Sequence, residues 1–294
     1  MAEFLVAGLG EILWDVLNDS EEIGGAPINF AYHAGALGAD SIAISTIGSD
    51  ERGRRSIEEL QARELNLEAV SIDPDHATGF VEAKIDKHGV AHYMFPDNIA
   101  WDHLTLNDKA MNLAPKIHAV CYGTLAQRNK KARNSIYAFL DAAPKAMKVY
   151  DMNLRQHFYS KEIISKSLEK ADVLKLNDDE IQIVASMFDL KGTENQMLEI
   201  LHNKFNLNCS ILTRGSKGSL IIGYGQEIES DGIVLDILEN TIGAGDSFTA
   251  ATILGLLLEH SLSDISKHAN KLAAYVCSCK GAMPPIPEEF KLIK

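Results

Sequence analysis

Near its C-terminal end the chain reads Asn240-Thr241-Ile242-Gly243-Ala244-Gly245-Asp246-Ser247-Phe248, and an apolar run continues to Leu258. The run has helical length and composition, so the glycines form the turn into a helix N-terminus. The first N–H groups of a helix lack intrahelical partners, and the helix dipole adds partial positive charge there. Such a turn suits a phosphate, with Asp246 beside it as a candidate base. The alternative is an ordinary glycine turn with a capping aspartate.

Composition sets the limits on function. The chain has 294 residues, 46% hydrophobic and 23% charged, which is typical of a globular protein. The net charge of −13 argues against nonspecific binding to nucleic acid or to anionic membranes. The longest apolar run is too short to span a bilayer, and the N-terminus has no basic segment that would suggest a signal peptide. The four cysteines lack zinc or disulfide spacing, so we expect reduced thiols in a cytoplasmic protein.

After Trp101 the chain alternates between short apolar segments and amphipathic ones. This pattern predicts right-handed crossovers and a mainly parallel sheet covered on both faces, with ligands at the carboxyl ends of the strands. We predict strands at 119–122, 148–151, 173–176 and 210–213, and helices at 130–142, 161–170, 179–188, 194–205 and 264–280.

The N-terminal part has a different sequence pattern. A strand at 4–10 ends in Gly8-Leu9-Gly10, which lacks the third glycine and the helix of a dinucleotide-binding fingerprint. Alternation at 79–85 and 90–95 around a turn at 86–89 predicts an antiparallel hairpin. Together with a strand at 12–17, this hairpin would form a small sheet that acts as a lid. A second predicted hairpin, at 219–223 and 228–238, leads into the glycine turn.

Polar residues follow three of the predicted strands. They begin at Asp151, Asn177 and Thr213, and each group alone could be a helix cap or a plain turn. Asn29 lies in the first turn of a helix opened by Gly24-Gly25-Ala26-Pro27, where it can reach a polar ligand. Because parallel strands present their carboxyl ends at one edge, we expect these groups to form one site.

Two motifs together resemble the signatures of a known family. Gly24-Gly25-Ala26-Pro27-Ile28-Asn29 and Thr241-Ile242-Gly243-Ala244-Gly245-Asp246 are similar, in order and spacing, to those of the ribokinase-like (PfkB) carbohydrate kinases. Segments 10–15, 123–128 and 151–155 resemble most closely the fructokinases of that family. The resemblance implies a single domain over 1–294 with a ribokinase-like three-layer α/β/α fold. It also implies a lid sheet whose strands come from about 11–23 and 76–100.

The resemblance implies a role for each matching residue. Asp246 would be the general base, and the N–H groups of Ala244, Gly245 and Asp246, with the Gly243 turn, would form the anion hole. The sugar-binding positions would be Asp15, Gly25, Asn29 and Arg155. The nucleotide-binding positions would be Asn177, Thr213, Gly215, Gly218, Asn270 and Gly281. Glu180 would hold Mg²⁺, through water, beside the phosphates of ATP.

One departure from the family concerns a monovalent cation. Many relatives bind K⁺ beside the anion hole with an acid, where this chain has Asn240. An amide offers an oxygen but no charge, which weakens the expectation of K⁺ activation. A second departure from the family is Ile28, which is bulkier than the alanine common at this position and would reshape the pocket slightly.

The leading interpretation is an ATP-dependent fructokinase. Ribose, 2-keto-3-deoxygluconate or a nucleoside are alternative substrates, and a phosphorylated sugar would need basic residues such as Arg52, Arg54 or Arg155 near the pocket. A non-catalytic sugar- or nucleotide-binding protein is a second class, which the intact Asp246 and glycine turn disfavour. No GxxxxGK[ST] sequence is present, so the phosphate site is not a P-loop. A homodimer through the lid is a candidate assembly.

Overall fold

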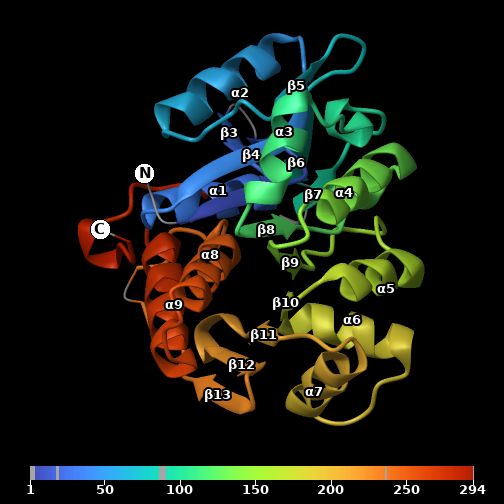
Figure 1. Cartoon of the computed structure of the whole chain (residues 1–294). Helices are drawn as coiled ribbons and strands as arrows, with labels where there is room; N and C mark the ends of the chain where they lie inside the picture. Colours follow the sequence, from blue (N-terminus) through green and yellow to red (C-terminus); the bar gives the residue numbers. More distant parts are fainter. Residues whose placement is uncertain (1–3, 18–19, 86–90, 236, 294) are drawn as a thin grey trace.

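A computed structural model describes residues 4–17, 20–85, 91–235 and 237–293 (Figure 1). Its central sheet has nine strands in the order β13-β12-β11-β10-β9-β8-β1-β4-β5. Neighbouring strands from β11 to β5 run parallel, whereas β12 and β13 are antiparallel, which confirms a mainly parallel sheet. The strands are β1 (Leu5–Leu9), β4 (Asp40–Gly48), β5 (Val70–Asp73), β8 (Ala119–Tyr122), β9 (Met147–Asp151), β10 (Val173–Asn177), β11 (Cys209–Thr213), β12 (Ser219–Gly223) and β13 (Gln226–Ser230).

Helices cover both faces of this sheet, as Figure 1 shows. Alternation along β10 explains the two layers, because Val173 packs toward one group of helices and Leu174 toward the other. The Val173 side holds α1 (Ala26–Ala36), α8 (Ala244–Leu257) and α9 (Leu262–Cys277). The Leu174 side holds α3 (Asp108–Leu113), α4 (Lys130–Ala142), α5 (Lys161–Lys170), α6 (Asp178–Phe188) and α7 (Glu194–Lys204). The three-layer α/β/α architecture is therefore confirmed.

A second, four-stranded sheet has the order β3-β2-β6-β7. It consists of β2 (Leu13–Leu17), β3 (Ser20–Gly24), β6 (Gly79–Ile85) and β7 (Ala91–Met94). Helix α2 (Glu51–Ala62) packs on one face of this small sheet, where the buried Trp14 donates a hydrogen bond from Nε1 to Ser56 Oγ at 2.9 Å. The predicted turn at 86–89 lies outside the described residues.

The C-terminal hairpin differs from its prediction. Its second strand ends at Ser230 instead of continuing to Leu238, and residues 231–243 form no regular element where they are described. Gly232 gives the reason, since a Cβ there would lie 2.1 Å from the Ser216 carbonyl oxygen. The chain crosses directly over the 215–218 turn at this point and cannot extend the ladder. Helix α8 also begins earlier than the apolar run, at Ala244.

Short 3₁₀ turns complete the fold at Ala100–His103, Ala114–Lys116, Leu125–Gln127, Gly215–Lys217 and Glu288–Phe290. No helix in the described part of the chain is both long and apolar enough to cross a membrane.

Candidate active site

The glycine turn forms the N-terminus of α8. Gly243 caps the helix with φ 77°, in the left-handed region that favours glycine. A Cβ on Gly243 would lie 2.4 Å from the Ala282 carbonyl oxygen, so the turn is pressed against the segment that follows α9. Among the described residues, the N–H groups of Gly245 and Asp246 have no hydrogen-bond acceptor. They are therefore available to an anion.

Asp246 is held by a residue from the other end of the chain. Asn29 Nδ2 donates a hydrogen bond to Asp246 Oδ2 at 2.8 Å. Burial and, to a lesser extent, the nearby Asp151 raise the pKa of Asp246 to about 6, against the opposing effects of Lys175, Asn29 and Arg155. A carboxyl group with this pKa is ionised at neutral pH and can accept a proton.

Asp15 and Asn29 flank the Gly24-Gly25 turn. A Cβ on Gly24 would lie 3.3 Å from Asp15 Oδ2 and 3.7 Å from Asn29 Oδ1, so both side chains converge on this glycine. Gly25 has φ 119°, and a Cβ there would lie 2.3 Å from the Glu11 carbonyl oxygen. Burial raises the pKa of Asp15 to about 6, with Arg155 lowering it and Glu22 raising it.

Arg155 is the cation that this cluster of carboxyl groups shares. It lowers the pKa of Glu11, Asp15 and Asp246. Arg155 is exposed. Among the described residues, its guanidinium group donates a hydrogen bond only to the Leu154 carbonyl, at 3.2 Å. It is therefore free to meet an anionic or hydroxyl-rich substrate.

Arg52 and Arg54, the other basic candidates, face elsewhere. Arg52 lies over the Phe80 ring at 4.3 Å on the α2 side of the small sheet. Arg54 forms ion pairs with Glu51 and Glu58 along the exposed face of α2. Of these three arginines, Arg155 is therefore the one that lies beside the predicted sugar-binding positions.

A cavity of about 700 Å³ adjoins the N-terminus of α8. Five of the predicted nucleotide positions line it: Asn177, Thr213, Gly215, Gly218 and Asn270. Its remaining wall is largely apolar, formed by Ile233, Val234, Leu235, Leu238, Phe248, Ala273 and Ala274. An apolar slot for a flat base and a glycine-rich turn for phosphates suit a nucleoside triphosphate.

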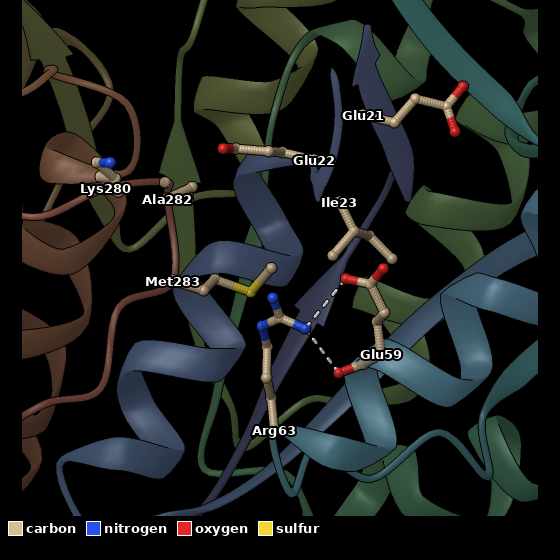
Figure 2. Close-up of a pocket in the computed structure, with 9 residues that line it drawn as sticks. Glu21, Glu22, Ile23, Glu59, Arg63, Lys280, Ala282 and Met283 are labelled. Carbon is tan, nitrogen blue, oxygen red and sulfur yellow. Dashed lines mark hydrogen bonds and ion pairs between the residues drawn. The ribbon is translucent and has the colours of Figure 1, made fainter. Parts of the chain in front are cut away.

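Gly281, the sixth predicted nucleotide position, lies in a different hollow of about 290 Å³. Figure 2 shows this hollow between β3, the end of α2 and residues 280–283, with Arg63 donating to the backbone and the carboxylate of Glu59. A Cβ on Gly281 would lie 3.3 Å from Glu22 Oε2. Gly281 is thus where the small sheet approaches the segment behind the anion hole.

Glu180 occupies a structural position at the start of α6. Its two carboxylate oxygens accept backbone N–H groups of Leu154 at 2.8 Å and Asn177 at 2.9 Å, and the side chain of Asn177 caps the helix in return. Burial raises the pKa of Glu180, which Lys175 lowers. The described residues contain no group of three His, Cys, Asp or Glu suited to a metal. Mg²⁺ commonly enters such sites on substrate phosphates with few protein ligands, which this arrangement fits.

Asn240 uses both ends of its amide to close the loop. Its Nδ2 donates to the Cys279 carbonyl at 2.8 Å, and its Oδ1 accepts the Ile242 N–H at 2.8 Å. Both polar ends of the amide are therefore engaged within the loop, and neither is free to hold a cation. These residues do not fit a K⁺ site.

Three buried ionisable residues at the site have no role assigned from the sequence, although Asp151 begins one of the predicted polar groups. Lys175 Nζ lies 3.1 Å from Asp151 Oδ1, and Thr249 donates to Asp151 Oδ2 at 2.9 Å. Burial alone would lower the pKa of Lys175, but Asp151, Glu180 and Asp246 raise it, so the residue is an ammonium. A lysine inside the otherwise apolar strand 173–176 was the signal that could have found this pair.

Glu11 is the third of these residues. It is 1% exposed, and its carboxyl group accepts the backbone N–H of Ala26, in the first turn of α1. Its Oε2 has no hydrogen-bond partner. Burial raises the pKa of Glu11 to about 7, against its backbone hydrogen bonds and Arg155.

A nucleotide-sized cavity that opens on a helix N-terminus carrying a carboxylate is the arrangement of a small-molecule kinase. The chain matches the profile of the pfkB family carbohydrate kinases over residues 9–289, and it belongs to this family. The members of this family are carbohydrate kinases, so the chain is a phosphotransferase with a sugar hydroxyl as acceptor.

Sugar kinases from other organisms can be aligned with nearly the whole chain. A fructokinase of Klebsiella pneumoniae is 26% identical over 95% of each chain. An ATP-dependent 6-phosphofructokinase of Thermoanaerobacterium thermosaccharolyticum is 24% identical over 96% of this chain and 91% of its own. The structure of a Vibrio cholerae fructokinase bound to fructose, ADP and calcium has a TM-score of 0.81 at 23% identity, covering 97% of this chain and 96% of its own.

Proposed function

We propose that the chain is a fructokinase, which transfers the terminal phosphoryl group of ATP to fructose and forms fructose 6-phosphate and ADP. The observation that carries this proposal is the 2.8 Å bond from Asn29 to Asp246 at the N-terminus of α8. It joins the sugar-binding turn and the phosphate-binding turn in one site.

The reaction follows from the positions of these groups. Asp246 takes the proton of the sugar hydroxyl as its oxygen attacks the phosphorus, and the bond from phosphorus to the bridging oxygen of ADP breaks. Negative charge on the transferred group meets the N–H groups of Gly245 and Asp246 and the positive end of the helix dipole. Bound Mg²⁺ would neutralise further charge on the phosphates.

The proposal of an unphosphorylated sugar rests on the placement of the arginines. A sugar phosphate needs a second cluster of cations beyond the anion hole. Arg52 and Arg54 are engaged on α2, so Arg155 alone remains beside Asp15. Arg155 can bind the sugar or the phosphate in transfer.

The test is an ATP-consumption assay with fructose, fructose 6-phosphate, ribose, glucose, 2-keto-3-deoxygluconate and nucleosides, using Asp246→Asn as the inactive control. We expect fructose to give the highest kcat/KM. A higher value for ribose, the keto acid or a nucleoside would replace fructose as the substrate. Absence of turnover with every member of the panel would favour a binding protein over an enzyme.

A further inference from the structure

Lys175 lies against the first turn of α8. Its side chain is 8% exposed, and it lines the nucleotide cavity together with Ala244 and Gly245. A Cβ on Gly245 would lie 2.9 Å from Lys175 Nζ. The positive charge is therefore beside the two backbone N–H groups that have no acceptor in the described structure.

The ammonium group of Lys175 retains hydrogen-bonding capacity. It has three N–H donors, and Asp151 is its one hydrogen-bond partner among the described residues. The other oxygen of Asp151 lies 2.9 Å from the Thr249 hydroxyl, and the Gly245 carbonyl also lies 2.9 Å from it, so the two acceptors share one hydroxyl proton. Asp151 and Thr249 thus fix the ammonium relative to α8.

We propose that Lys175 binds the terminal phosphate of ATP and the phosphoryl group in transfer. This inference rests on the proposed kinase function and adds a side chain to the anion hole. A buried cation with spare donors beside a cavity attracts an anion strongly, because little water screens the charge. The free N–H groups of Gly245 and Asp246 would bind the same phosphate beside the ammonium group.

A purely structural role for Lys175 is the competing explanation. In that case the lysine would serve only to neutralise Asp151, and replacing the pair by uncharged residues would be harmless. The two explanations differ in one variant. A protein with both Lys175→Met and Asp151→Asn leaves neither member of this ion pair without its partner, but it also has no ammonium for the phosphate.

The experiment measures binding without sugar, by calorimetric titration of Mg-ADP and of the β,γ-imido analogue of Mg-ATP. The proteins are the wild type, Lys175→Met, the double variant and Lys175→Arg. We expect both Lys175→Met proteins to bind the imido analogue about tenfold or more weakly, as the loss of a charged hydrogen bond predicts, with ADP affinity changed less than about threefold. Lys175→Arg should retain part of the wild-type preference for the imido analogue over ADP.

Three results would overturn the inference: an unchanged affinity for the imido analogue, an equal loss for both nucleotides, or recovery of wild-type affinity in the double variant. The double variant keeps the test valid should Lys175→Met alone fail to fold. Fructose is not used, so a failure of fructose as the substrate leaves these titrations readable. Failure of the wild type to bind either nucleotide would instead count against the kinase proposal itself.

Discussion

At the scale of single residues, Asp246 departs from the behaviour of a free aspartate. The ordinary pKa of an aspartate is near 4, whereas burial raises the pKa of Asp246 to about 6. The base form is therefore lost as the pH falls through 6. We predict that kcat/KM is half its maximum near pH 6, falls below that pH and levels off above about pH 7. Asp246→Asn should lower kcat by about 10³-fold at pH 7.5. Near-normal turnover in this variant would reject Asp246 as the base.

Glu11 predicts a stability effect that is separate from turnover. Its pKa rises from 4.5 to about 7 on folding, so between these values the folded state binds more protons than the unfolded state. Stability from this group is therefore lost as the pH rises through that window. Glu11→Gln should match the wild type in Tm at pH 5 and have the higher Tm at pH 8. The difference in the free energy of unfolding at pH 8 should be on the order of 3 kcal/mol at most. Equal pH dependence of Tm in both proteins would contradict the assignment.

Asn240 predicts how the enzyme responds to potassium. Its side-chain N–H already donates a hydrogen bond to the Cys279 carbonyl. We therefore expect kcat to change less than about twofold between K⁺ and tetramethylammonium at equal ionic strength. Asn240→Asp should reverse this, because a carboxylate facing a carbonyl needs a cation between them. Potassium activation of the wild type would show that the amide reorients.

At the scale of elements, α2 holds the small sheet from its outer face. Arg55 lies over the Trp14 ring at 4.2 Å and Arg52 over Phe80, and both guanidinium groups bond to Glu21. We predict that Arg55→Ala destabilises the protein by about 1 kcal/mol in urea unfolding and raises the KM for the sugar but not for ATP. The expected effect on KM follows from the proposal that Asp15, in the same sheet, binds the sugar.

Arg54→Ala is the matched control for this prediction. Arg54 is on the same helix but pairs only with Glu51 and Glu58 at the surface. It should change neither stability beyond a few tenths of a kcal/mol nor KM. An equal effect of both substitutions would mean that the charge of α2, and not its contact with the small sheet, is responsible.

At the scale of the whole molecule, we expect the small sheet to close over the sugar as a lid. Its β3 strand is separated from residues 280–283 by the hollow in Figure 2, which leaves room for it to approach. Hydrogen exchange should slow in peptides covering 13–17 and 79–83 when fructose and a non-hydrolysable ATP analogue bind. The peptide covering β9 should not change. Unchanged exchange in both sheets would reject the lid.

The sequence predicts the architecture well because strand–helix alternation and glycine motifs are local signals. The paired motifs around Gly25 and Gly245 also identify the family. What the sequence could not show depends on distant contacts: the crossing of Gly232 over the 215–218 turn, which ends β13 early, and the burial that alters Asp246 and Glu11. Glu180 shows the same limit, since its backbone partner at Leu154 is 26 residues away and appears only in three dimensions.

The contact between Lys175 and Gly245 ties two positions that lie seventy residues apart in sequence. Any side chain at 245 would occupy the space of the ammonium group, and a shorter residue at 175 would make that space available. Substitutions at the two positions are therefore coupled, so we expect neither position to change alone. A library that diversifies the glycine turn to change the substrate should vary position 175 in the same clones.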